Sequence, residues 1–218
     1  MGSGKLQKLY KQIDNCKFCK TDKNLLQHIH GFGVLNPNLM LILVNPTYRN
    51  LSSDPEYKDV RFPFIGVRQF WKVLADGGLI DKGVGYGLPL RKDWKDKHTE
   101  QIKQELIQNK LFLTNIVKCC YGHSLYPENR VIAEQLKLLA EEIRIVRPKK
   151  IVAFGGLVYK ILTKKNVRLS DYWVEGREEK KETVSGLMVP VIPCYFPVGR
   201  GNPKKAAEIM RKFLQMQK

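Results

Sequence analysis

Short apolar runs, each bounded by glycine, proline or polar residues, recur along this chain and predict buried strands. Their residues are apolar at nearly every position, whereas a strand with one solvent-facing side would alternate apolar and polar residues. This pattern is typical of strands that are covered on both faces of a sheet. The four predicted strands are residues 39–44, 111–117, 150–154 and 187–192.

Apolar residues between these strands recur with the period of a helix. In residues 132–146 they are spaced four and three positions apart, so one apolar stripe faces the core until Pro148 stops the helix. The same spacing predicts a helix after Gly66 and another around Phe213. Strands that alternate with helices predict an α/β fold with a central, mostly parallel four-stranded sheet flanked by helices.

Two polar stretches lack this period. Residues 76–97 are rich in glycine and charge and are expected to form a surface excursion, and residues 171–185 a polar hairpin. With 218 residues and 43% hydrophobic content, the chain can bury one sizeable core. A single domain over residues 1–218 is therefore expected.

The composition also indicates the cellular compartment of the protein. The longest apolar run, residues 39–44, is too short to cross a bilayer, so no membrane partner is expected. Five cysteines, two of them adjacent and two in a Cys-x-x-Cys pair, favour metal binding in a reducing compartment over an extracellular disulfide framework. We therefore expect a cytoplasmic protein.

The charge of the chain is strongly positive. Its 38 Lys and Arg residues stand against 21 Asp and Glu residues, which gives a formal net charge of +17. Such an excess attracts polyanions and speeds their encounter with the protein. Adaptation to heat is an alternative explanation, but it would enrich Glu together with Lys. Nucleic acid is therefore the favoured partner class.

Four short segments place polar or aromatic side chains where a strand runs into a loop. In an open parallel sheet, ligands collect at the carboxyl ends of the strands, so these segments are expected to converge on one crevice. They offer two carboxamides, an aromatic ring and a basic loop, a set that can hold a flat ring with a hydrogen-bonding edge. The segments are residues 43–46, 63–66, 114–119 and 196–200.

In this order, the segments resemble the motif series of the uracil-DNA glycosylase superfamily over almost the whole chain. The Cys16 and Cys19 pair, the Pro-Phe-Ile-Gly segment and the Thr-Asn-Ile-Val-Lys-Cys segment are most similar to family 4. The Asn45-Pro46 pair is more similar to the mismatch-specific and single-strand-selective branches. The resemblance implies a three-layer α/β fold that binds DNA and hydrolyses the bond between uracil and deoxyribose, which initiates base excision repair.

The resemblance also implies a role for each pocket residue. Asn45 would position the attacking water, Phe64 would stack on the flipped base, and Asn115 would pair with uracil N3–H and O4. A carboxamide offers one donor and one acceptor, which suits uracil and rejects cytosine, whose exocyclic amine reverses the pattern. A core position for Phe64, a capping amide at Asn115 and a plain turn at Asn45 are the alternatives.

Phe196 takes the position of a family histidine. A histidine there donates to a uracil oxygen, whereas a phenyl ring cannot, so one source of leaving-group stabilisation is missing. The Tyr195 hydroxyl and the backbone amides of residues 198–201 are candidates to replace it. Exclusion of thymine depends on which residue of the first segment faces the base: Thr47 would admit thymine, whereas Tyr48 would favour uracil alone.

The last segment is predicted to grip DNA. Its glycines allow close approach to a phosphate backbone, and Arg200 would enter the gap left by the flipped base or contact a phosphate. Basic residues on the predicted C-terminal helix would extend this surface. The predicted DNA-binding residues are Val198, Gly199, Arg200, Gly201 and Asn202.

The cysteines predict a structural metal that the chemistry itself does not need. The resemblance to family 4 implies a 4Fe-4S cluster, whose fourth cysteine would fall near Glu134, where this chain has none. The spacing around Cys120 and His123 would suit tetrahedral zinc as well, and a free Cys-x-x-Cys pair is the alternative. The candidate ligands are Cys16, Cys19 and Cys119, with Cys120 or His123 as the fourth.

Two other functions fit the same residues. A binder of damaged or single-stranded DNA would keep the pocket without turnover, which the phenyl ring of Phe196 favours. A glycosylase for another deaminated or mismatched base would need a wider pocket, which Thr47 favours. Excision of uracil is the leading hypothesis.

Overall fold

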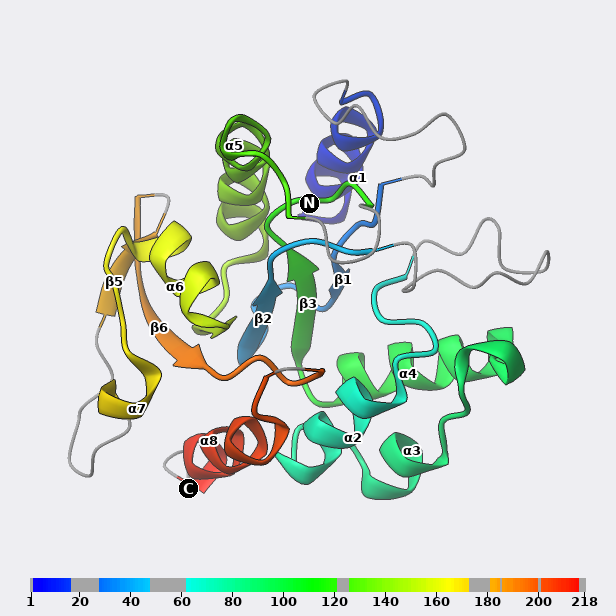
Figure 1. The fold of residues 1–218 in the computed structure, drawn as a ribbon. Coiled ribbons are helices and arrows are strands. Elements are labelled where there is room, and N and C mark those ends of the chain that lie inside the picture. The colour runs from blue at the N-terminus through cyan, green and yellow to red at the C-terminus, as the bar shows by residue number, and fades with distance from the viewer. Residues whose placement is uncertain are drawn as a thin grey trace.

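A sheet forms the middle layer of the protein (Figure 1). The computed structural model describes residues 2–16, 28–47, 62–120, 126–172, 181–184, 186–199 and 201–215. In these residues the sheet has six strands in the order β1-β3-β2-β4-β6-β5. The strands are β1 Phe32–Gly33, β2 Leu39–Leu43, β3 Leu111–Asn115, β4 Lys150–Phe154, β5 Lys181–Val184 and β6 Leu187–Cys194.

The four strands predicted from the sequence are the parallel ones. β2 pairs in parallel with both β3 and β4, and β4 pairs in parallel with β6. The short strands β1 and β5 were not predicted individually, and they add antiparallel edges to β3 and β6. The polar hairpin expected over residues 171–185 does not form within those bounds in the described residues. Residues 171–172 belong to the helix α7 Leu169–Tyr172, and β5 forms its hairpin with β6.

Helices cover both faces of the sheet, as near-continuous apolar strands require. On one side, α2 Arg68–Asp76, α4 Asp96–Gln108 and α8 Pro203–Gln215 share a core with Leu39, Leu41 and Leu43 of β2. On the other side, α5 Asn129–Val146 and α6 Gly156–Thr163 pack on Met40 and Ile42. The α/β three-layer prediction is confirmed.

The remaining helices are shorter or adjoin these layers. Figure 1 shows α1 beside α5 on one side of the sheet and α3 beside α2 on the other. No helix in the described part of the chain is long and apolar enough to span a bilayer. The bounds of these elements are α1 Gly2–Asp14, α3 Lys82–Gly87, the 3-10 helix η3 Arg91–Asp93 and α7 Leu169–Tyr172.

The expectation of a surface excursion over residues 76–97 is wrong in part. This stretch contains α3 and η3, and Leu88 and Trp94 are almost fully buried. Trp94 Nε1 donates to Thr99 Oγ1 at 2.9 Å, which satisfies the indole inside the core. The glycines that suggested a loop instead allow close packing, because a Cβ on Gly85 would lie 2.5 Å from Ala75 Cβ of α2.

Candidate active site

The two carboxamides predicted for the pocket follow neighbouring strands. Asn115 is the last residue of β3, in register with Leu43 at the end of β2. The chains stay paired beyond the strands, since Ile116 N donates to Leu43 O and Val117 N to Val44 O, both at 2.8 Å. Asn45 therefore follows β2 at the same carboxyl edge at which β3 presents Asn115.

Asn115 has an exceptional environment for a polar side chain. It is 1% exposed, and within the described part of the chain neither its Nδ2 nor its Oδ1 has a hydrogen-bond partner. Alternation along β3 puts its side chain on the same side of the sheet as Leu111 and Leu113. A buried amide without partners costs about 1–3 kcal/mol, so this side chain is prepared for a ligand with a polar edge.

Phe64 lies on that same side of the sheet. It belongs to the core cluster of Leu43 and Leu113 and stacks on Phe70 of α2, with ring centroids 4.0 Å apart and planes 13° apart. Its backbone has a φ of 63°. Trp71 Nε1 donates to its carbonyl oxygen at 3.0 Å. Phe64 is thus a core residue, 4% exposed, whose ring is fixed by its neighbours.

Steric crowding explains why a glycine follows Ile65 in the segment of Phe64. Gly66 has a φ of 71°, and a Cβ there would lie 2.5 Å from Arg91 Cα. Only glycine lets the turn that carries Phe64 pass so close to η3.

The segment that contains Asn45 is less buried than the segments that contain Phe64 and Asn115. Asn45 is half-buried, and its Nδ2 donates to Pro46 O at 3.0 Å. This bond leaves Oδ1 as the atom that can accept a hydrogen bond from water. Thr47 is half-buried as well, whereas Tyr48 lies outside the described residues.

The segment after β6 forms a tight turn that is attached to α2. Gly201 N donates to Val198 O at 3.1 Å, and a Cβ on Gly201 would collide with the carbonyl oxygen of Phe196. Gly199 has a φ of 59°, and its N–H donates to Gln69 Oε1 at 3.2 Å. The backbone amides of Gly199 and Gly201 are therefore already engaged, although the sequence suggested them as donors to the base.

The other residues of this segment have distinct surroundings. Phe196 is 38% exposed, which is high for a phenyl ring. Tyr195 is half-buried, with Lys205 Nζ 5.5 Å above its ring. Asn202 Oδ1 accepts from Lys205 N at 3.1 Å and so caps α8, which gives Asn202 a structural role. Arg200 lies outside the described residues.

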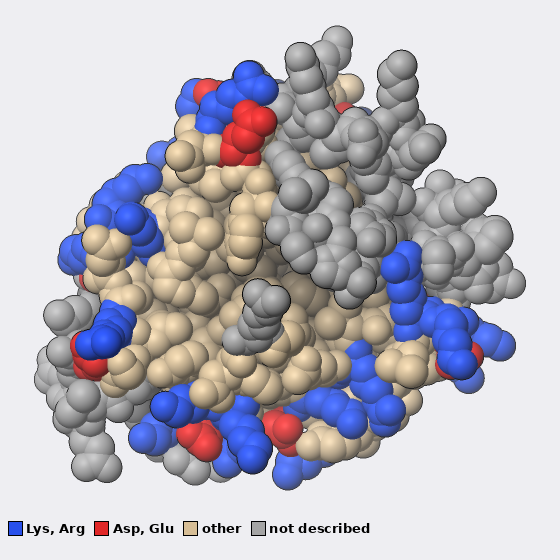
Figure 2. Space-filling model, viewed as in Figure 1, with Lys and Arg blue, Asp and Glu red and all other residues tan. Residues whose placement is uncertain are grey.

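Basic side chains line the lower margin of this face of the molecule. Figure 2 shows Lys and Arg, with a few Asp and Glu among them, along the margin formed by α8, α2 and α3. Such a cationic margin suits phosphates that lie outside a pocket while the base is held inside it.

A buried ionic network lies on the opposite side of β3. Lys118 Nζ is 2.6 Å from Glu142 Oε2, and both side chains are 0% exposed. The sequence analysis missed this pair. Its signal is the position of Glu142 on the core-facing stripe of α5, where the helical period calls for an apolar residue.

Gln135 is a second residue that the sequence analysis missed, and it lies on the same stripe of α5. It is fully buried, its Nε2 donates to Cys16 Sγ at 3.1 Å, and its Oε1 accepts from Lys118 N at 3.2 Å. Its neighbour Glu134, where a fourth cysteine was expected, pairs instead with Lys137 on the surface.

The described residues supply no four-cysteine cluster. Gln135 Nε2 donates to Cys16 Sγ, and Gln135 Oε1 accepts from the backbone N–H of Lys118, which precedes Cys119. Among the residues that the structure describes, no three histidine, cysteine or acidic side chains gather into a metal site. Cys19 and His123 lie outside those residues.

Two further cysteines are buried thiols. Burial raises the pKa of Cys120 to about 12. Cys194 ends β6 with its Sγ 3.8 Å from Ala206 O, and burial raises its pKa as well. Cys194 is thus a buried thiol at the end of a strand.

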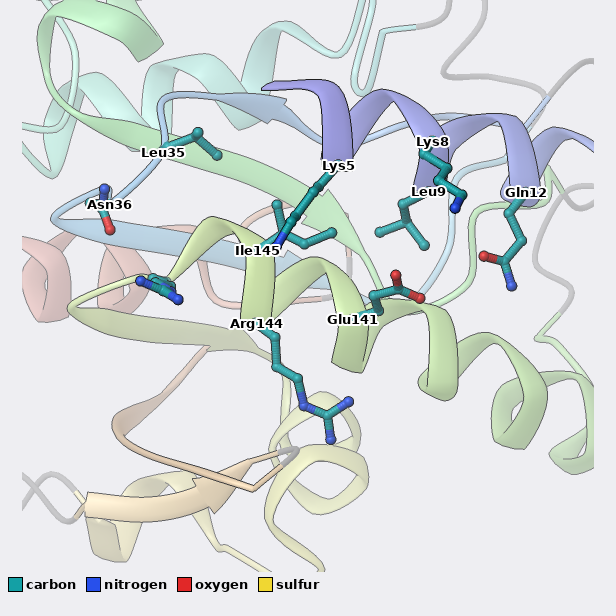
Figure 3. Close-up of a pocket in the computed structure, with 10 residues that line it drawn as sticks. Lys5, Lys8, Leu9, Gln12, Leu35, Asn36, Glu141, Arg144 and Ile145 are labelled. Carbon is teal, nitrogen blue, oxygen red and sulfur yellow. The ribbon is translucent and has the colours of Figure 1, made fainter. Parts of the chain in front are cut away.

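A groove of about 750 Å³ lies elsewhere, between α1 and α5 near the amino ends of β2 and β4. Its floor includes Leu9 and Leu35, and its rim carries several cations. Figure 3 shows that these cations diverge: Arg144 points away from α1, whereas Lys5 extends toward Ile145. This groove therefore lacks the convergent polar groups that the carboxyl edge presents.

Comparisons with known proteins agree with the geometry. The family model described as the uracil DNA glycosylase superfamily matches residues 30–216. The chain is also 26% identical over 157 residues to a type-4 uracil-DNA glycosylase of Pyrobaculum aerophilum. That alignment covers 72% of this chain and 64% of the relative, so the chain spans less than two thirds of the relative's length.

Proposed function

Because the chain belongs to the uracil DNA glycosylase superfamily, we propose that it excises uracil from DNA by hydrolysing the N-glycosidic bond. The observation that carries this proposal is the buried carboxamide of Asn115, which has no partner in the described part of the chain. Uracil presents a donor and an acceptor side by side, N3–H and O4, which complement that carboxamide. Pairing would remove the cost of the unsatisfied amide.

Access to the base requires that the nucleotide leaves the duplex. Flipping costs the stacking and pairing of the base, and contacts in the pocket must replace them. Phe64, held by Phe70 and Trp71 on the Asn115 side of the sheet, supplies an aromatic surface for this purpose. Stacking of a base on an aromatic side chain contributes about 1–3 kcal/mol.

The hydrolysis itself uses water at C1′. Asn45 Oδ1 accepts a hydrogen bond from the attacking water, whose oxygen bonds to C1′ as the bond from C1′ to uracil N1 breaks. The electron pair of that bond leaves with uracil, and the water gives its proton to solvent. A neutral amide is no general base, so the rate depends on placement of water and on stabilisation of the uracil anion.

Stabilisation of the anion is the weak point of this site. Phe196 has no donor for uracil O2, and the amides of Gly199 and Gly201 already donate to Gln69 and Val198. Slow turnover follows from this arrangement. The same observation favours a second candidate function, in which the protein binds damaged or single-stranded DNA without cleaving the base.

A structural metal is a separate part of the proposal. Its candidate ligands are Cys16, Cys19 and Cys119. Of these, Cys16 and Cys119 lie on the α5 side of the sheet, whereas the residues proposed for hydrolysis lie at the carboxyl edge. An absorption spectrum of anaerobically purified protein, together with elemental analysis, distinguishes the two alternatives. Broad visible absorbance is expected for an iron–sulfur cluster and none for a zinc ion.

A cleavage panel tests the proposed function. The protein is incubated with oligonucleotides that carry uracil, thymine opposite guanine, hypoxanthine or xanthine, and abasic sites are cut with alkali. Cleavage of the uracil strand is expected. Tight binding without any cut product would support the binder, and preferential cleavage at another base would assign the other glycosylase activity.

The proposed role of Asn45 is tested with a substitution and a matched control. Asn45→Ala is expected to slow cleavage without abolishing binding, because it removes the contact to water. Asn166→Ala replaces an exposed asparagine in the loop after α6 and is expected to leave the rate unchanged.

A further inference from the structure

A buried ion pair lies directly behind the residue proposed to select the base. Lys118 Nζ donates to Glu142 Oε2 at 2.6 Å and to the backbone carbonyl oxygen of Asn115 at 2.8 Å. We propose that Lys118 and Glu142 are positioning residues that orient Asn115 for base recognition. This inference rests on the proposed function of the same pocket.

The strand geometry explains why Asn115 needs such a contact. At the outer edge of β3, Leu111 O accepts from Val34 N at 3.1 Å, next to β1. Carbonyls of alternate residues point to the same edge of a strand, so Asn115 O points there too. In the described part of the chain, β1 pairs only with Phe112 and Leu113. Lys118 therefore holds the carbonyl that the sheet no longer pairs.

The Glu142 carboxylate is also contacted by side chains of two other elements, β3 and α1. Thr114 Oγ1 donates to Glu142 Oε2 at 2.8 Å, and it also contacts Lys118 Nζ. Tyr10 of α1 donates to Gly31 O at 2.7 Å and lies 3.2 Å from Glu142 Oε1. Burial and the nearby Glu142 carboxylate raise the pKa of Tyr10, so its hydroxyl stays protonated as a donor. Both carboxylate oxygens thus have fixed partners.

Close packing over this network depends on one glycine. A Cβ on Gly31 would lie 2.6 Å from Glu142 Oε1 and 2.9 Å from Thr114 Oγ1. The segment before β1 can therefore cover the carboxylate only because residue 31 has no side chain.

Fold stability alone is a weak reason for this arrangement. Burial lowers the pKa of Lys118, and Glu142 opposes that shift, so burying this pair carries a desolvation cost. Apolar residues of similar size commonly stabilise a core as well as a buried pair does. Asn115, by contrast, has no side-chain partner in the described residues, so its orientation depends on its backbone.

The test separates positioning from stability. The double variant Lys118→Met with Glu142→Leu replaces the pair by apolar side chains, and its midpoint of thermal unfolding is expected to stay near that of the parent. We expect kcat/KM for uracil release to fall about 100-fold, as for a reacting group displaced by about 1 Å. Discrimination of uracil against cytosine is expected to fall with it.

A mutant cycle with Asn115→Ala provides the decisive arm. If the pair acts through Asn115, the double variant causes no further loss of rate in the Asn115→Ala background. Equal losses in both backgrounds, or a folded double variant with the parental rate, would overturn the inference. If the double variant does not fold, Glu142→Gln and Tyr10→Phe take its place, and the same non-additivity with Asn115→Ala is expected.

Failure of the proposed function gives a different result. The parent protein would then neither release uracil nor bind an oligonucleotide with non-hydrolysable 2′-fluorodeoxyuridine more tightly than one with deoxycytidine. The positioning role would fall with it. Activity in the parent together with unaffected variants would overturn the positioning role alone.

Discussion

Two side chains at the carboxyl edge differ in what they can offer a ligand. Asn115 offers a complete donor and acceptor pair with no internal partner in the described part of the chain. Phe196 offers neither, at a position where a donor to the leaving group is expected. Under the proposed function, base selection and leaving-group stabilisation are therefore separable, and a change at Phe196 should act on the rate alone.

Phe196→His is expected to raise the single-turnover rate of uracil release by about 10-fold to 100-fold. One donor to a developing oxyanion is typically worth about 100-fold or more, and an imidazole placed by substitution recovers part of that. Phe196 is 38% exposed, so the fold tolerates the change. The rate is measured by quench-flow on a uracil oligonucleotide, with Phe196→Leu as the control without a donor. An equal rate for both variants would show that the missing donor is supplied elsewhere.

At the scale of elements, apolar spacing predicted the parallel strands and the helices α2, α5 and α8, because each has a clear buried stripe or run. It did not predict α3, whose sequence is half glycine. Gly85 allows α3 to pack closely on α2. A contact between two helices cannot be recognised from the sequence of either helix alone. The segment was therefore taken for a loop.

Gly85→Ala is expected to lower the free energy of unfolding by about 1–3 kcal/mol, the usual cost of overpacking a tight contact. The added Cβ would lie 2.5 Å from Ala75 Cβ. Gly87→Ala in the same helix is the control, since nothing lies within 4 Å of its Cβ position, and its effect is expected within about 0.5 kcal/mol. Urea unfolding measures both. Equal effects would contradict the close contact of α2 and α3.

Gln69 of α2 accepts a hydrogen bond from the turn after β6. Gln69→Ala removes the acceptor for Gly199 N–H and is expected to raise KM for DNA about threefold to tenfold, the worth of one hydrogen bond. The unfolding midpoint should not move, because Gln69 is exposed. Steady-state kinetics measure the effect, with exposed Gln101→Ala on α4 as the control. An unchanged KM would mean that the turn keeps its shape without this contact.

At the scale of the whole molecule, the sequence predicted the charge but not its distribution. The net charge of +17 indicated a polyanionic partner, and the structure adds the cationic margin along α8, α2 and α3. The Lys118 network and Gln135 could not be predicted, because they join residues far apart in the chain, such as Tyr10 and Glu142. Only the folded chain brings these polar groups to the same interior positions.

DNA binding is expected to weaken steeply with salt. Each phosphate contact contributes about 0.9 to the slope of log affinity against log salt concentration. Lys204→Gln, at the start of α8 beside the turn, should reduce that slope by about one. Lys160→Gln, exposed on α6 across the sheet, should leave it unchanged. Fluorescence anisotropy from 50 to 200 mM salt measures the slopes, and identical slopes for both variants would exclude α8 from the DNA-binding surface.

The central claim is that the carboxamide of Asn115 selects uracil for excision. Its most direct test is the single-turnover rate of abasic-site formation in a uracil oligonucleotide, measured for the parent protein, Asn115→Ala and Asn166→Ala. The account predicts cleavage by the parent and by Asn166→Ala, and a loss of about 100-fold or more in Asn115→Ala. The parental rate in Asn115→Ala would contradict it.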